Sequence, residues 1–149
     1  MQIIKQAKIS RRRGGEAVKG VGANVTRGLQ TGSKLVCIDN SGAREVKIIS
    51  VIGYKGTRRR YPKAGIGDMI IVSVRKGKPE LRKQLFEAIV VRQRRPYRRP
   101  DGAMVSFEDN AVVLTNRNGD VRGSGIKGPI AREAADRWPR IAAIASMVV

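Results

Sequence analysis

The sequence predicts a mainly β protein built as a small closed barrel, and three observations support this. Short runs of β-branched and aliphatic residues recur along the chain, each ended by residues that favour turns. The connections between these runs are strongly basic, so that strand and cationic loop alternate. Two of the runs flank Asp101-Gly102, a pair that favours the tight turn of a hairpin. Short strands with turn signals at this spacing favour a closed barrel over a parallel sheet.

The strands are expected from Lys34 onward, after a first part without aromatic residues. The run 45–54 places β-branched residues on alternate positions, as a half-buried strand requires. The run 86–91 leads into an arginine-rich excursion, the Asp101-Gly102 turn and a returning apolar run, which together predict a long two-stranded ribbon carrying arginine. Strands are expected at 35–38, 45–54 and 86–91, the segment 64–74 gives a strand after a glycine-rich turn, and the chain returns through the apolar runs 103–107 and 111–114.

The C-terminal part predicts one or two short helices over about 129–145. Pro129 is favourable as a first helical residue, and Ile130, Ala134 and Trp138 fall close to one helical face. Proline at 139 ends this helix. We expect Trp138 to pack against the barrel, although this charge-neutral end could also face a protein partner.

Net charge points to a polyanionic partner. The 149 residues form one domain of ordinary size and carry 31 Lys and Arg against 12 Asp and Glu, a formal charge of +19. Residues 1–100 hold 25 basic and 6 acidic residues, whereas residues 101–149 hold six of each. Nucleic acid is favoured over a membrane, because no apolar run approaches the roughly 20 residues that span a bilayer. The opening lacks the apolar region of a secretory signal, so a cytoplasmic location is expected.

Residues 1–33 read as a basic, glycine-rich N-terminal arm, and residues 34–149 as a single barrel domain with the helical segment at its end. The arm has too little apolar surface to fold alone. Its arginines, Arg11, Arg12 and Arg13, adjoin two glycines and could become ordered against RNA. A leader without a role is the alternative.

The most arginine-rich segment lies between Arg92 and Arg99, where five of eight residues are arginine. Guanidinium groups bind phosphate oxygens through paired N–H donors and stack on bases, and an interleaved tyrosine adds a second stacking surface. A solvated charge run is the alternative, and it is weakened by the further basic clusters. The candidate RNA-binding residues here are Arg92, Arg94, Arg95, Tyr97, Arg98 and Arg99.

Two more connections are basic. A barrel fixes where each connection emerges, so several weak phosphate contacts act as one site whose affinity falls steeply with salt. The candidates in the segment 55–63 are Lys55, Arg58, Arg59, Arg60, Tyr61 and Lys63. Those in the segment 75–83 are Arg75, Lys76, Lys78, Arg82 and Lys83.

No catalytic constellation is recognisable in the sequence. Histidine is absent, so the usual proton shuttle near neutral pH is missing, and one cysteine, Cys37, forms no internal disulfide. The same absence argues against a metal site, and no cofactor is expected. The glycines of 123–128 fit a dinucleotide motif, but the chain has no room for the following strand and acidic residue, so they predict a tight structural loop.

Several blocks of the chain show a specific resemblance. Ala88 to Val91, Asp101-Gly102, Phe107, Asn110 and Val113-Leu114 follow a signature spacing. Further blocks are CIDNSGAREVKIISVIGYKG, AGIGDMIIVSV, GKPELRK and GPIAREAADRWPRIA. Over about residues 34–149 the chain resembles the universal large-subunit ribosomal family L-fourteen, called L-twenty-three in older eukaryotic naming. GKPELRK and the segment 138–142 are similar to its archaeal and eukaryotic branch.

The resemblance implies a five-stranded barrel with a projecting ribbon and short C-terminal helices. It implies a structural constituent of the large ribosomal subunit that binds large-subunit rRNA and lies on the face meeting the small subunit. Its implied partners are small-subunit rRNA across the interface, neighbouring ribosomal proteins and an anti-association factor at the C-terminal end. The candidate protein-contact residues are Arg132, Trp138 and Arg140. A free nucleic-acid-binding regulator or chromatin protein and an RNA-modifying enzyme are the alternatives.

Overall fold

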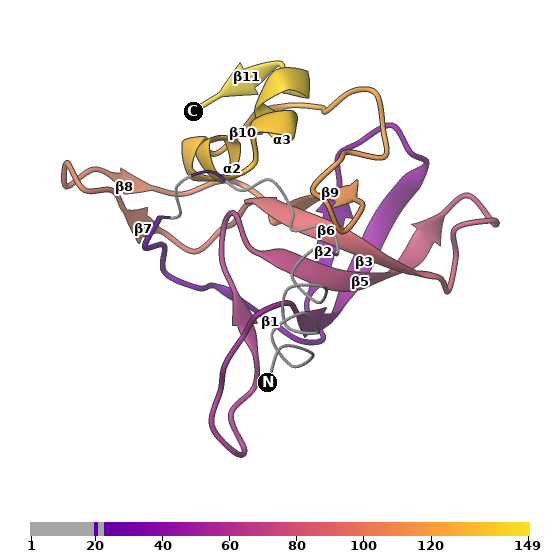
Figure 1. The fold of residues 1–149 in the computed structure, drawn as a ribbon, viewed down its shortest axis with the longest axis horizontal. Helices are drawn as coiled ribbons and strands as arrows, with labels where there is room; N and C mark the ends of the chain where they lie inside the picture. The colour runs from indigo at the N-terminus through magenta and orange to yellow at the C-terminus, as the bar shows by residue number, and fades with distance from the viewer. Residues whose placement is uncertain (1–19, 21–22) are drawn as a thin grey trace, which may run out of the picture.

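The centre of the fold is a closed barrel of five strands, confirming the predicted architecture (Figure 1). The computed structural model describes residue 20 and residues 23–149, so Arg11, Arg12 and Arg13 lie outside the described residues. The barrel order is β2-β3-β5-β6-β9. Their bounds are β2 (Lys34–Cys37), β3 (Ala43–Val51), β5 (Met69–Gly77), β6 (Leu85–Arg92) and β9 (Ala111–Thr115).

The barrel closes through a parallel pair, whereas its other neighbours are antiparallel. Val36 of β2 lies opposite Ala111 of β9, and Cys37 opposite Val112. The interior is filled with β-branched and aliphatic side chains, as in other small barrels. Every residue of β9 is buried, which explains why its sequence is a continuous apolar run rather than an alternating one.

The predicted ribbon is present but short. The register of β6 against β9 shifts between Val90 and Arg92, and such irregularities turn a strand away from its sheet. Beyond this point β7 (Tyr97–Arg98) pairs with β8 (Met104–Val105). Gly102, with φ of 89°, forms the turn where expected, and its N–H donates to Arg99 O at 2.9 Å. Prolines at 96 and 100 limit the ladder to two residues per strand, because proline has no N–H to donate.

The C-terminal segment contains two short helices, α2 (Arg132–Arg137) and α3 (Pro139–Ile144). The expectation that Pro129 begins a helix is wrong. Pro129 lies in β10 (Pro129–Ile130), which pairs in parallel with β11 (Met147–Val148). The following residue stays extended because the Ala131 N–H donates to Val91 O of the barrel at 3.1 Å. None of the helices in residues 23–149 is long and apolar enough to cross a membrane.

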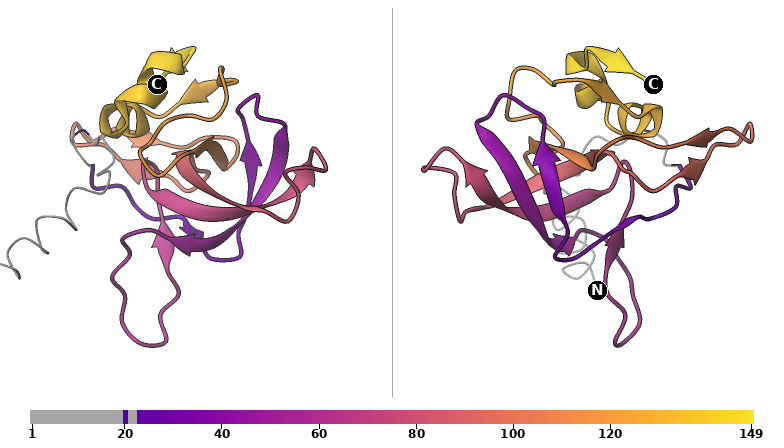
Figure 2. Two further views of the ribbon diagram at one scale, coloured as in Figure 1. Left: turned by 45° about the vertical axis from the view of Figure 1, so that its right-hand side comes forward. Right: turned by 180° about the vertical axis from the view of Figure 1, so that it is seen from behind.

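Residues 23–30 run along the barrel before its first strand. Within them β1 (Leu29–Gln30) pairs with β4 (Lys63–Ala64), and Leu29 is buried in the core. The connection from β3 to β4 projects from the side of the barrel away from α2 and α3 (Figures 1 and 2). The ribbon and the β5–β6 connection extend toward opposite ends of the molecule (Figure 1). The three basic segments therefore point in different directions.

Candidate nucleic-acid interface

Tyr97 does not offer a surface to a base, contrary to the sequence-based expectation. The residue is 1% exposed, and its hydroxyl donates to Glu133 Oε2 at 2.8 Å. Burial, together with this hydrogen bond to a carboxylate, raises the pKa of Tyr97 to about 12. Tyr97 therefore joins the ribbon to α2.

Arg99 is held inside the protein by the same carboxylate. Its Nε donates to Glu133 Oε1 at 2.8 Å and its Nη2 to Val149 O at 2.6 Å. Burial acts to raise the pKa of Glu133, but the hydrogen bonds from Arg99 and Tyr97 outweigh it and hold this pKa below its ordinary value. Arg99 thus ties the ribbon to α2 and to the end of β11, with its guanidinium neutralised.

Arg92 is also neutralised within the chain. Its Nη2 donates to Asp109 Oδ2 at 3.1 Å, and its side chain is only 12% exposed. The base of the ribbon is fixed by Gln93, whose amide donates to Thr26 O at 2.8 Å, and by Asn110, whose Oδ1 accepts from the Arg94 N–H at 2.8 Å. The ribbon arginines left facing solvent are Arg94, Arg95 and Arg98.

The 55–63 connection presents all of its predicted residues to solvent. Lys55, Arg58, Arg59, Arg60, Tyr61 and Lys63 are exposed. Tyr61 is 69% exposed, and no ion pair joins this connection to another part of the described chain. Unlike Tyr97, Tyr61 is available for stacking. This segment has the geometry that the sequence predicts for phosphate and base contacts.

The 75–83 connection is exposed as well, and the fold adds cations to it. Its predicted residues, Arg75, Lys76, Lys78, Arg82 and Lys83, all face solvent. Lys76 is partly neutralised by Glu45, at 3.1 Å between Nζ and Oε2. Arg44 and Lys127 join Lys76, Lys78 and Arg82 around a hollow of about 730 Å³. Sequence reasoning missed both residues because tertiary contacts bring them in: the pairing of β3 with β5 places Arg44 near Lys76, and a bridge between Asp39 and Ile126, 87 positions apart, brings in Lys127.

The three predicted protein-contact residues lie in different environments. Trp138 is 1% exposed, and its Nε1–H donates to Gly67 O at 2.7 Å. The packing interpretation of Trp138 is confirmed, and its side chain is not available to a partner. Arg132 and Arg140 are exposed, and Arg140 forms an ion pair with Asp120.

The turn after β2 is structural. Burial and the nearby Asp39 raise the pKa of the Cys37 thiol to about 12, so the thiol is protonated at neutral pH. Asn40 Oδ1 accepts from the Ser124 N–H at 2.7 Å, which docks the glycine-rich loop 123–128 and confirms its structural role. Residue 20 and residues 23–149 contain no group of three carboxylate or thiol side chains placed to hold a metal.

Fold and surface together define a class, the small basic β-barrel proteins with several cationic connections. The family model for ribosomal protein L14p/L23e matches residues 28–149. The chain is 60% identical to the large ribosomal subunit protein uL14 of Thermoplasma volcanium and 58% identical to that of Haloarcula marismortui, each over 132 residues that cover 89% of this chain and 100% of the relative.

The chain belongs to the L14p/L23e family of ribosomal proteins, and its relatives place it with the archaeal type. It is a structural protein of the large ribosomal subunit and not an enzyme, and it is located in the ribosome in the cytoplasm. The family thus decides against both alternatives, the free regulator and the RNA-modifying enzyme.

Proposed function

We propose that the chain binds large-subunit rRNA through the ribbon and the 55–63 connection. The observation that carries this proposal is the set of exposed, unneutralised cations held on a rigid barrel: Arg94, Arg95, Arg98, Lys55, Arg58, Arg59, Arg60 and Lys63. Arginine forks match phosphate geometry, and Tyr61 adds a ring for stacking. Because the barrel fixes where both segments emerge, their cations act together as one site, and the anchored ribbon needs little further ordering on binding.

The 75–83 connection serves as the contact across the subunit interface, with small-subunit rRNA. It lies at the opposite end of the molecule from the ribbon (Figure 1), so both ends can meet RNA at once. Its hollow is lined by five basic side chains from three separate segments, an arrangement suited to phosphate groups. The protein thereby contributes to an intersubunit bridge.

The C-terminal end serves as the protein-contact surface. Met147, Val148 and Val149 are exposed apolar residues, and the Arg132 N–H donates to Val149 O at 2.9 Å. Apolar side chains rimmed by charge are typical of protein interfaces. Neighbouring ribosomal proteins and an anti-association factor are the partners we assign to this surface. Within this proposal the basic arm places Arg11, Arg12 and Arg13 against RNA, and the domain of residues 34–149 also takes in β1, whose Leu29 is buried in its core.

Assembly into the large subunit tests the RNA contact. A tagged variant with Arg94, Arg95 and Arg98 replaced by alanine should co-sediment with large subunits less than the wild type at moderate salt. The matched control replaces the same three residues with lysine, which keeps the charge and loses the paired donors, and it should fall between the two. Wild-type incorporation of the alanine variant would contradict the assignment of the ribbon.

A further inference from the structure

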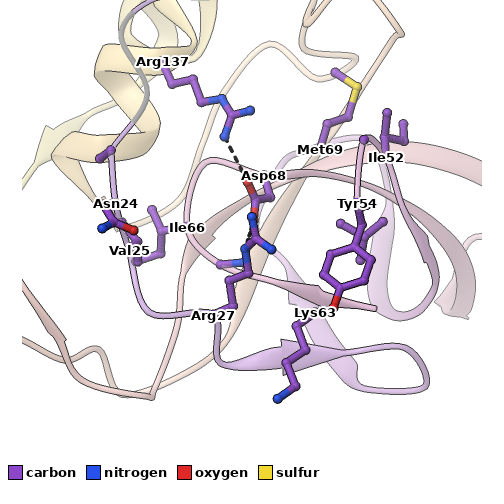
Figure 3. Close-up of a pocket in the computed structure, with 14 residues that line it drawn as sticks. Asn24, Val25, Arg27, Ile52, Tyr54, Lys63, Ile66, Asp68, Met69 and Arg137 are labelled. Carbon is purple, nitrogen blue, oxygen red and sulfur yellow. Dashed lines mark hydrogen bonds and ion pairs between the residues drawn. The ribbon is translucent and has the colours of Figure 1, made fainter. Parts of the chain in front are cut away.

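A cavity lies beside the predicted basic segments, and its lining residues, apart from Lys63, were not among the candidates. It has a volume of about 610 Å³ and is lined by residues 23–25 and Arg27, by the end of β3 with the residues after it, by Lys63 and the loop before β5, and by Arg137. Figure 3 shows Arg27 at its centre, with Tyr54 and Lys63 on one side and Asp68 above. The volume is within the range of pockets that hold small ligands.

One wall of the cavity is a stacking platform. The guanidinium carbon of Arg27 lies 5.5 Å from the centroid of the Tyr54 ring. The Arg27 side chain is 53% exposed, so the platform is open to solvent on the arginine side. Aromatic rings and guanidinium planes are the surfaces on which unstacked RNA bases settle.

Arg27 is only loosely held by the acid beside it. Asp68 Oδ1 accepts from Arg137 Nη1 at 2.9 Å, and its Oδ2 accepts from the Gly65 N–H at 2.9 Å. The Arg27 Nε lies 4.0 Å from Oδ2, at the limit of an ion pair. Asp68 is therefore satisfied without Arg27, and the Arg27 guanidinium can turn toward a ligand at little cost.

The cavity has an excess of positive charge. Its lining includes the cations Arg27, Lys63 and Arg137 and the single carboxylate of Asp68, a net charge of +2. Lys63 is exposed and forms no ion pair with a described residue, and it ends the 55–63 connection. An RNA strand whose phosphates lie along the 55–63 connection therefore reaches Lys63, and its next base lies beside the Tyr54–Arg27 platform.

We infer that this cavity receives one unstacked nucleotide of an RNA strand. Its base lies on the Tyr54–Arg27 platform and its phosphate on Lys63. The inference rests on the proposed RNA-binding function and adds to it a site that depends on the base, whereas contacts to phosphate alone do not. The alternative is that these ion pairs only fasten residues 23–27 to the barrel. In that case the protein would bind RNA with and without the base equally well.

The test uses the full chain and a single-stranded RNA pentamer, compared with the same pentamer lacking its central base. Affinity is measured by fluorescence anisotropy, and the tyrosine rings are followed by NMR, with Tyr54 assigned from the Tyr54→Phe variant. Tyr54→Phe keeps the ring and should bind as the wild type does. Tyr54→Leu keeps apolar bulk, loses the ring and should bind the intact pentamer roughly tenfold more weakly. Phe86→Leu is the matched control, because it removes a half-buried ring that lies under Arg122 outside the cavity, and it should keep both the affinity and the preference of the wild type.

The expected result is that wild type prefers the intact pentamer, that the Tyr54 signal shifts only with it, and that Tyr54→Leu abolishes the preference. Equal binding of the two pentamers, or an unchanged preference in Tyr54→Leu, overturns the inference. Adenosine monophosphate at the same concentration should leave the Tyr54 signal unshifted. A shift equal to that caused by the pentamer would show that the cavity binds a free nucleotide and not a nucleotide of an RNA strand, and would overturn the inference. Failure of the proposed RNA binding gives a different result. The wild type would then bind both pentamers as weakly as the ribbon alanine variant does, whereas failure of the inference alone leaves the wild type binding both pentamers more tightly than that variant.

Discussion

The ribbon and the 55–63 connection have nearly the same composition but differ in how their charges are used. Arginines occupy five of eight positions from Arg92 to Arg99, and basic residues occupy five of nine from Lys55 to Lys63. In the ribbon, Asp109 and Glu133 neutralise Arg92 and Arg99, and the tyrosine is buried. In the 55–63 connection every cation and the tyrosine face solvent. Composition sets the charge of a segment, whereas the acids that the fold brings near decide which charges remain for a partner.

The difference is also one of rigidity. The ribbon is tied to α2, to β11 and to residues 23–28, so its three exposed arginines have fixed origins. The 55–63 connection is held by few backbone contacts besides the Arg60 N–H to Thr57 O at 3.2 Å. The ribbon resembles a preorganised surface, and the connection a segment that pays ordering entropy on binding.

The largest expected effect is on stability, from the same substitution in the two regions. Arg99→Ala leaves Glu133 partly buried without its cationic partner, and it should lower the free energy of unfolding by roughly 3 kcal/mol. Arg59→Ala removes an exposed side chain and should change it by less than about 0.5 kcal/mol. Chemical denaturation of both variants measures the two changes in the free energy of unfolding. Equal costs would show that the two regions are not anchored differently.

The next effect concerns salt. Replacing Arg58, Arg59 and Arg60 with alanine should reduce the logarithmic salt slope of binding to single-stranded RNA by roughly 2, since each phosphate contact contributes about 0.7. Replacing Arg92 alone should leave this slope unchanged, because its guanidinium is already neutralised by Asp109. Titrations at a series of salt concentrations give both slopes. A lower slope for Arg92→Ala would mean that the Asp109 pair opens on binding.

A smaller effect is expected on acidification. The pKa of Glu133 is below its ordinary value of 4.5, so its ionised form stabilises the fold above that pH, and the contribution is lost as pH falls through the lowered pKa. The difference in unfolding free energy between wild type and Glu133→Gln should therefore be full at neutral pH and shrink below about pH 4.5. Chemical denaturation at a series of pH values measures this difference, and a difference that stays constant down to about pH 3 would contradict the prediction.

The smallest effect is at alkaline pH. The pKa of Tyr97 is raised from 10.0 to about 12, so its neutral phenol stabilises the fold below pH 10, and this contribution is lost as pH rises from 10 to 12. Tyrosinate absorbance of the wild type should include a step near pH 12 that is missing in Tyr97→Phe. Tyr61→Phe should retain that step. Loss of the step in Tyr61→Phe would contradict its assignment to Tyr97.

Local patterns in the sequence predicted most of the barrel. Alternating β-branched residues located β3, and the Asp101-Gly102 pair located the ribbon turn, because both signals depend on neighbours in the chain. The parallel pairing of β2 with β9 has no local signal, since it joins segments more than 70 positions apart. The start of α2 was placed too early because Ala131 donates to the barrel, a tertiary contact that overrides the helical preference of Pro129.

The site was less predictable than the fold. Composition identified the three cationic segments, and the structure exposes most of their residues. Composition did not indicate that Glu133 neutralises Arg99 across 34 positions or that Asp109 neutralises Arg92. The Tyr54–Arg27 platform was not predicted either, because neither residue lies in a dense basic run. Density of charge along the chain therefore indicates where a partner binds but not which side chains remain available.

The parallel pairing of β2 with β9 constrains how the chain is made. Val36 cannot find its partner Ala111 until 75 further residues have been synthesised, and only then does Asp39 accept the Leu114 N–H at 2.9 Å. By that time residues 1–100, with the whole cationic surplus, have already been polymerised. The nascent polypeptide thus carries its full positive charge while the barrel is still an open sheet with unpaired strand edges, a state prone to aggregation.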